Sequence, residues 1–130
     1  MVSATTRNIL VSVETSFIEE QSSHDEEYYV WAYRITIANE SAERVQLMTR
    51  HWKISDELGR VQEVQGDGVI GQQPLIEPGD SFTYSSGTPL QTPSGFMHGS
   101  YQMRLPNGTQ FDVEIPAFSL DCPYQKPQVH

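Results

Sequence analysis

The residues with the clearest potential for chemistry form a glycine-rich segment at positions 66–74, with the sequence GDGVIGQQP. The spacing of its glycines is typical of a loop that binds phosphate through backbone N–H groups. Such a loop works when a helix follows, because the helix directs its N-terminal donors and its dipole at the anion. Here Pro74 and Pro78 follow at once, and no helical apolar period begins between Gly71 and Asp80. The segment is therefore predicted to be a loop between strands.

Two roles for this loop remain open. In the structural role, the glycines hold positive φ angles or let two sheets approach, and Pro74 fixes the exit of the chain. In the binding role, the loop engages a protein partner or a small anion through Gly66, Asp67, Gly68, Val69, Gly71 and Pro74. The counter-charges for an anion would be Arg50, His51, Lys53 and Arg60. Asp67 would oppose a phosphate unless it pointed away or met a bridging cation.

No catalytic constellation accompanies the loop. The sequence has no Gly-x-Ser-x-Gly elbow, and no two of its histidines have the i, i+4 spacing of a helical metal site. His51 has the most crowded chemical neighbourhood, and a hydrogen-bonded structural histidine is the favoured interpretation. Acidic pairs such as Asp56-Glu57 fall in predicted turns, where they lack the two different environments of an acid–base pair. We expect a non-enzymatic protein without catalytic residues, metal site or cofactor.

Composition restricts the partners and the compartment. Eight basic and seventeen acidic residues give a formal net charge of -9, which disfavours nucleic acids and anionic membranes as partners. Cys122 is the single cysteine, so no intramolecular disulfide can form and a reducing cytoplasm is the expected compartment. No signal peptide and no apolar run long enough for a bilayer are visible in the 130 residues.

The elements that must position these residues are strands, because apolar and polar residues alternate along most of the chain. Within the third strand, the alternation places Val45 and Leu47 on one face and Met48, Trp52 and Ile54 on the other. Residues 87–95 are rich in glycine and proline and are predicted to connect two strands. The strands are predicted at residues 9–17, 28–39, 44–55, 60–65, 81–86, 96–105 and 111–115.

About seven short strands with frequent turn signals indicate an all-β fold, an antiparallel β-sandwich of immunoglobulin or fibronectin type III-like shape. A closed barrel is the alternative. The length is that of one domain covering residues 1–130, and residues 121–130 are predicted to form a loose C-terminal tail.

Several motifs together resemble those of the ApaG family, also called CorD. They are Arg50-His51-Trp52, Gly66-x-Gly68-Val69-x-Gly71-x-x-Pro74, Pro78-Gly79, Phe82-x-Tyr84-x-Ser86 and Thr92-Pro93-x-Gly95-x-Met97-x-Gly99-x-Tyr101-x-Met103. The similarity extends from about Ile9 to Leu120, nearly the whole chain. It implies a fibronectin type III-like β-sandwich. It also implies an association with cobalt resistance and magnesium efflux in bacteria, while similar eukaryotic domains act as protein-binding modules. Pyrophosphate binding has been suggested for the family's glycine motif.

The sequence therefore favours a non-enzymatic interaction module that engages an unidentified protein through exposed sheet surface and the loops at 66–74 and 87–95. A small-anion binder, for pyrophosphate or a nucleotide, is the alternative. Pairing of edge strands into a homodimer is also left open.

Overall fold

The structure is a computed structural model that describes residues 1–122 of the chain. Of the tail predicted at residues 121–130, only the first two residues are described. Asp121 is the last residue of a strand, and Cys122 is buried, with its N–H donating to the carbonyl of Pro93 at 3.0 Å. These two residues belong to the sandwich, and the rest of the predicted tail lies outside the described residues.

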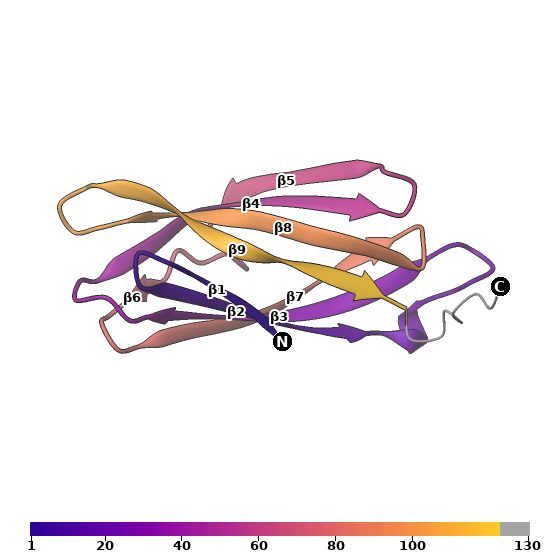
Figure 1. Cartoon of the computed structure of the whole chain (residues 1–130), viewed down its shortest axis with the longest axis horizontal. Coiled ribbons are helices and arrows are strands. Elements are labelled where there is room, and N and C mark those ends of the chain that lie inside the picture. The colour runs from indigo at the N-terminus through magenta and orange to yellow at the C-terminus, as the bar shows by residue number, and fades with distance from the viewer. Residues whose placement is uncertain (123–130) are drawn as a thin grey trace.

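Two antiparallel sheets form a sandwich, as Figure 1 shows. In the first sheet the order is β1-β2-β3-β7, and in the second it is β5-β4-β8-β9, with β6 also paired to β4. The prediction of an antiparallel β-sandwich is confirmed. The strands of the first sheet are β1 (Val2–Thr6), β2 (Ile9–Phe17), β3 (Tyr29–Asn39) and β7 (Ser81–Leu90). Those of the second are β4 (Val45–Asp56), β5 (Val61–Asp67), β6 (Leu75–Ile76), β8 (Ser94–Arg104) and β9 (Gln110–Asp121).

The described residues thus form nine strands, against about seven predicted from alternation. The short strands β1 and β6 were missed, because neither has a run of alternating apolar residues. Helical structure in this part of the chain is limited to the 3-10 turn η1 (Glu19–Gln21). None of the described helical structure is long and apolar enough to cross a bilayer.

The core lies between the sheets and consists of the inward-facing residues of both. Ile9, Val11, Ile35 and Ile37 of the first sheet are completely buried. Aromatic rings connect the layers. The ring of Tyr33 of β3 lies 5.5 Å from that of Trp52 of β4 and 6.2 Å from that of Phe118 of β9, measured between ring centroids. Burial of this apolar area from water is the main force that holds the sheets together.

A β-bulge changes the faces of β4. The register with β8 shifts between Leu47 and Thr49, so one extra residue is accommodated there. As a result, Trp52 and Ile54 are buried on the same face as Val45 and Leu47. The prediction that they occupy opposite faces was wrong, because it assumed strict alternation along the whole strand.

The predicted connection at residues 87–95 is mostly strand. Strand β7 continues through Leu90 and β8 begins at Ser94, so only residues 91–93 connect them. Thr88 and Leu90 are buried and pair with Trp31 and Tyr29 of β3. Pairing with β3 therefore overrides the local tendency of Gly87 and Pro89 to end the strand.

The two long sides of the sandwich differ. On one side β9 lies close to β1 and β2, where the N–H of Glu114 donates to Oγ1 of Thr6 at 3.2 Å. On the other side β5 and β7 are the outermost strands of their sheets. We call this second side the open side, and it is where the glycine segment lies.

Candidate functional site

The glycine segment forms a tight turn between β5 and β6, so the prediction of a loop between strands is confirmed. Val69 and Gln72 exchange two backbone hydrogen bonds of 2.8 and 2.9 Å. The two residues between them, Ile70 and Gly71, have φ angles of 43° and 77°. Positive φ at both central positions is the signature of a type I′ turn. No helix follows Gly71, because the chain continues into β6.

The backbone donors of this turn are largely used within the protein. The N–H of Gly68 donates to the carbonyl of Met48 at 2.8 Å, and those of Val69 and Gln72 bond to each other's carbonyls. A phosphate-binding loop needs several successive N–H groups directed at the anion. This turn therefore lacks the donor arrangement that the glycine spacing suggested.

Two of the glycines are explained by close contacts. A Cβ on Gly68, whose φ is 61°, would lie 2.1 Å from the carbonyl oxygen of Gln72. A Cβ on Gly66 would lie 2.9 Å from Nη1 of Arg50. Val69, between the glycines, is only 1% exposed and packs into the core. The glycine pattern thus allows the turn to fold back tightly and to insert Val69 between the sheets.

The four predicted counter-charges lie at three separate places. Arg50 donates from Nη1 to the carbonyls of Asp67 and Gly68 at 3.1 and 2.9 Å, and so fastens the turn to β4. His51 and Lys53 both approach Oε1 of Glu63, at 3.2 and 3.7 Å. Arg60 pairs with Asp56 at the β4–β5 turn. The structure does not bring the basic residues together around the glycines.

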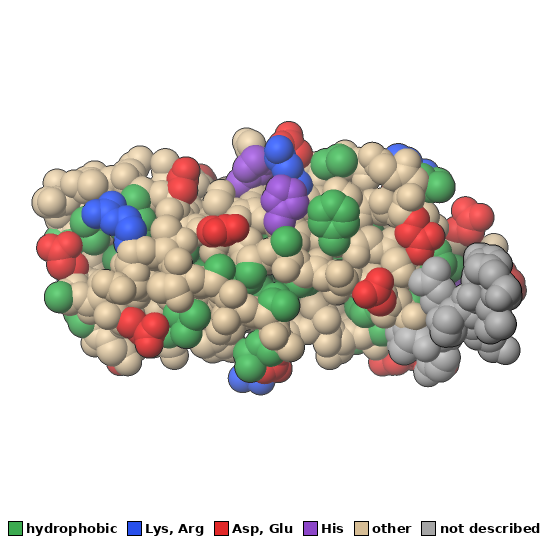
Figure 2. All heavy atoms as spheres, viewed as in Figure 1, with side chains coloured by type: hydrophobic (Ala, Val, Ile, Leu, Met, Phe, Trp, Pro, Cys, Tyr) green, Lys and Arg blue, Asp and Glu red, His purple; other side chains and the backbone are tan. Residues whose placement is uncertain are grey.

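The side chains of His51, Lys53 and His98 lie together on the outer face of the second sheet. Figure 2 shows histidine and basic side chains together on the face that carries β4 and β8. In this sheet Lys53 lies directly opposite His98, and the ring of His98 stacks on that of Phe96 at 6.3 Å. Among the described residues, no group of three or more His, Cys, Asp or Glu side chains could hold a metal ion.

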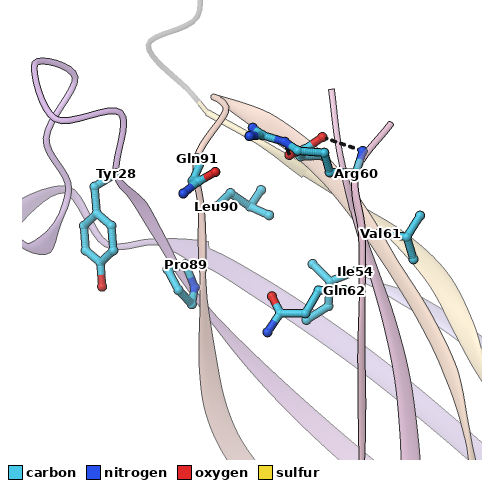
Figure 3. Close-up of a pocket in the computed structure, with 9 residues that line it drawn as sticks. Tyr28, Ile54, Arg60, Val61, Gln62, Pro89, Leu90 and Gln91 are labelled. Atoms are coloured by element: carbon cyan, nitrogen blue, oxygen red, sulfur yellow. Dashed lines mark hydrogen bonds and ion pairs between the residues drawn. The ribbon is translucent and has the colours of Figure 1, made fainter. Parts of the chain in front are cut away.

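An apolar groove that the sequence did not reveal lies at one end of the open side. It has a volume of roughly 340 Å³ and we call it the end groove (Figure 3). One wall comes from the β4–β5 hairpin, and the other from the end of β7 and the segment before β3. The lining residues are Tyr28, Ile54, Asp56, Arg60, Val61, Gln62, Pro89, Leu90 and Gln91. Tyr28 and Val61, which are 44% and 59% exposed, lie at its two margins, and the side chain of Val61 points away from Ile54 and Leu90 (Figure 3).

The rim of the end groove is fixed by Asp56. Its carboxylate accepts hydrogen bonds from the N–H of Leu58 at 2.9 Å, from the N–H of Arg60 at 3.0 Å and from Nε of Arg60 at 2.6 Å. Burial raises the pKa of Asp56, but the hydrogen bonds from Arg60 and Leu58 outweigh it and hold the pKa below its ordinary value. The turn that carries Val61 is therefore well ordered.

The same end of the sandwich is acidic. Burial raises the pKa of the Tyr29 hydroxyl, and the charges of Cys122, Glu27 and Glu57 raise it further. The hydroxyl of Tyr29 is hydrogen-bonded to Nδ1 of His24 at 3.0 Å. The charged residues that line the end groove itself are Asp56 and Arg60, which are paired with each other.

A smaller cavity follows on the open side, beside the glycine turn. It has a volume of roughly 190 Å³, and we call it the edge cavity. It is lined by Tyr33, Arg50, Trp52, Val69, Ile70, Tyr84 and Ser86. Ile70 at its mouth is 56% exposed. Sequence reasoning identified the turn but not this cavity, because its aromatic walls come from β3, β4 and β7.

Comparison with known proteins gives consistent similarity along the chain. A family model described as the ApaG domain matches residues 19–105. The chain is 52% identical over 130 residues to Protein ApaG of Paramagnetospirillum magneticum, covering 100% of both. It is 57% identical over 126 residues to Protein ApaG of Brucella canis, covering 97% of both. A crystal structure of the putative ApaA protein from Bordetella pertussis is 45% identical and superimposes with a TM-score of 0.87, covering 90% of this chain and 95% of that one.

Proposed function

We propose that this chain, which belongs to the ApaG family, is a non-enzymatic module that binds another protein on its open side. The observation that carries the proposal is the end groove, an apolar hollow that is lined by Ile54, Pro89 and Leu90 and has the exposed residues Tyr28 and Val61 at its margins. Contiguous exposed apolar surface on a charged protein is typical of an interaction site. The resemblance to eukaryotic domains that act as protein-binding modules supports the same function.

The arrangement of the walls also favours binding. The groove lies between two separate sheets, and each wall is held by regular strand pairing. Hydrogen bonds to Asp56 fix the turn on one side, and the buried side chain of Leu90 anchors the other. A rigid apolar hollow binds a partner with little loss of conformational entropy.

Small-anion binding is less well supported. It needs donors and positive charges directed at one point, and Arg50, Lys53 and Arg60 each engage a different group of the protein. The end groove has one basic side chain, Arg60, and it is paired with Asp56. The net charge of -9 of the chain also disfavours a phosphate compound.

The proposal is tested by site-specific photo-crosslinking in cells of the source organism. A photoreactive amino acid at Gln62 lies in the end groove, and the same amino acid at Gln102 is the control on the outer face of the second sheet. We expect one dominant protein adduct from Gln62, and we expect Val61→Glu to abolish it. Adducts that are equal at both positions, or that persist with Val61→Glu, would contradict the proposal.

Based on family resemblance, we also propose that this interaction acts in the cytoplasm and contributes to cobalt resistance and magnesium efflux. A strain that lacks the protein is expected to grow poorly with added cobalt salt. The unmodified protein should restore growth, and Val61→Glu at equal abundance should not. Restoration by both proteins would show that the end groove has no part in this phenotype.

A further inference from the structure

The outer edge of β7 is an unpaired strand edge with unusual properties. Strand β7 is last in its sheet and pairs with β3 from Ser81 to Leu90 without any register shift. Its ten residues, SFTYSSGTPL, include no charged side chain. Protein sheets commonly protect an exposed edge with charges or bulges, because unpaired N–H and C=O groups attract another strand. β7 lacks both of these protections, and its one edge-protecting residue is Pro89, near the end of the strand.

The phase of the β3–β7 pairing shows which backbone groups face outward. The N–H of Asn39 donates to the carbonyl of Asp80 at 2.9 Å, just before β7 begins. Because hydrogen-bonded and non-hydrogen-bonded pairs alternate, residues 81, 83, 85 and 87 direct their N–H and C=O groups away from β3. Two observations agree with this phase. Pro89, which has no N–H, falls in the outward set, and Thr83 contacts Thr36 through hydroxyls at 3.1 Å, as in a close non-hydrogen-bonded pair.

Two hollows lie in line beside this edge. The edge cavity is lined by Ser86, and the end groove is lined by Leu90. These two residues are four positions apart on one strand face, or about 13 Å along an extended chain. A strand added to β7 would place two of its own side chains, also four positions apart, over the two hollows. The hollows therefore match the side-chain spacing of an added strand.

Charge specifies the partner further. The chain carries a net charge of -9. A second copy of this chain would bring two strongly negative molecules together, which is unfavourable. A segment from another protein with a net positive charge would be attracted.

We propose that the partner contributes an extended segment that pairs with the outer edge of β7. The segment carries two apolar residues four positions apart, which enter the edge cavity and the end groove, and a net positive charge that complements the net charge of -9 of this chain. This inference rests on the proposed function, because it names the chemistry of the partner at the same site. Backbone pairing supplies affinity, and the two hollows supply sequence preference.

The test uses random twelve-residue peptides displayed on phage and selected on the full chain. Binding of the recovered peptides is then measured with Ser85→Pro, which removes an outward N–H, and with Ser85→Ala, which keeps it. Thermal unfolding of both variants confirms that they are folded. We expect at least a tenfold loss of affinity for Ser85→Pro and less than a twofold change for Ser85→Ala.

A second measurement does not depend on the proline variant. Amide hydrogen exchange with bound peptide should show new protection at Thr83, Ser85 and Gly87, and little at the outer strand β5. The recovered peptides could instead lose affinity for the Val61→Glu variant of this chain, keep it for the Ser85→Pro variant and leave these amides unprotected. That result would overturn pairing with β7 and leave the proposed function intact. Failure to recover any peptide, or a dimer of this chain that Ser85→Pro abolishes, would also overturn the inference.

Discussion

The guanidinium of Arg50 lies directly against the Cα of Gly66, so that a Cβ at position 66 would be 2.9 Å from Nη1. The same nitrogen donates to the carbonyls of Asp67 and Gly68. Absence of a side chain at Gly66 thus lets Arg50 cross the edge of β5 and hold the turn that follows. A glycine that suggested a ligand site from its spacing thus makes room for another side chain of the same protein.

Alanine substitutions at the three glycines should have different costs. Gly68→Ala is expected to lower the free energy of unfolding by more than about 2 kcal/mol, because its left-handed backbone alone costs roughly 1–2 kcal/mol and the carbonyl of Gln72 must also move. Gly71 has a φ of 77° and open space around its Cα, so Gly71→Ala should cost only the roughly 1–2 kcal/mol of the left-handed backbone. Urea unfolding of the variants measures the difference, and equal costs would contradict the contact at Gly68.

Gly66→Ala should be destabilising only while Arg50 is present. The new Cβ displaces the guanidinium and removes its two hydrogen bonds, which contribute about 1 kcal/mol each. In an Arg50→Ala background the same glycine substitution should cost much less. A double-mutant cycle by urea unfolding gives the coupling between the two residues, and a coupling near zero would show that Arg50 is not the reason for this glycine.

Pyrophosphate is expected not to bind at the glycine turn. The N–H groups of Gly68, Val69 and Gln72 already bond to carbonyls, and Arg50 is held by two others. Calorimetric titration with pyrophosphate should therefore give only heats of dilution, with or without magnesium or cobalt. A saturable signal that Gly71→Ala removes would show that the turn rearranges to bind an anion.

The sandwich could be predicted from the sequence because the driving pattern is local. Alternation along β2 and β3 places Ile9, Val11, Ile35 and Ile37 on one buried face, and the structure has them there. The bulge near Met48 could not be predicted in this way. It depends on pairing with β8, and it reverses the faces of everything that follows in β4, including Trp52.

The candidate site was less accessible to sequence reasoning than the fold. The glycine turn was found, because glycine spacing is visible in the sequence. The end groove was not, because Tyr28, Val61 and Leu90 come from three distant segments and each is unremarkable in its own strand. Their proximity is a consequence of long-range strand pairing, which alternation does not specify.

The carboxylate of Asp56 should titrate below the ordinary range of aspartate. Hydrogen bonds from Arg60 and Leu58 outweigh the effect of burial and lower its pKa. A lowered pKa in the folded state means that the contribution to stability is present above the unfolded pKa, near 4, and is lost as the pH falls through the folded pKa. NMR titration of the side-chain carboxyl measures the pKa directly. Arg60→Ala should move it upward, and no movement would contradict the assigned cause.

The buried hydroxyls of Tyr84 and Tyr101 should be strongly coupled. They are hydrogen-bonded to each other between the sheets, and both residues are at most 5% exposed. Tyr84→Phe leaves the Tyr101 hydroxyl without this partner and should cost about 1–3 kcal/mol. Replacing both tyrosines with Phe removes both polar groups, so the double variant should be more stable than the sum of the single effects predicts. Additive effects in urea unfolding would contradict the hydrogen bond.

The same two tyrosines predict a loss of stability at high pH. Burial raises the pKa of Tyr84 and Tyr101, and the hydroxyl of Tyr84 raises that of Tyr101 further. In the unfolded chain both tyrosine hydroxyls ionise at pH ~10, whereas in the folded chain they stay protonated at that pH. Stability is therefore fully present below that pH and decreases above it, by up to roughly 3 kcal/mol per pH unit for two groups. The variant with Phe at both positions removes this contribution, so its unfolding free energy should decline less steeply above pH ~10. Parallel declines in the two proteins would show that these hydroxyls ionise without unfolding.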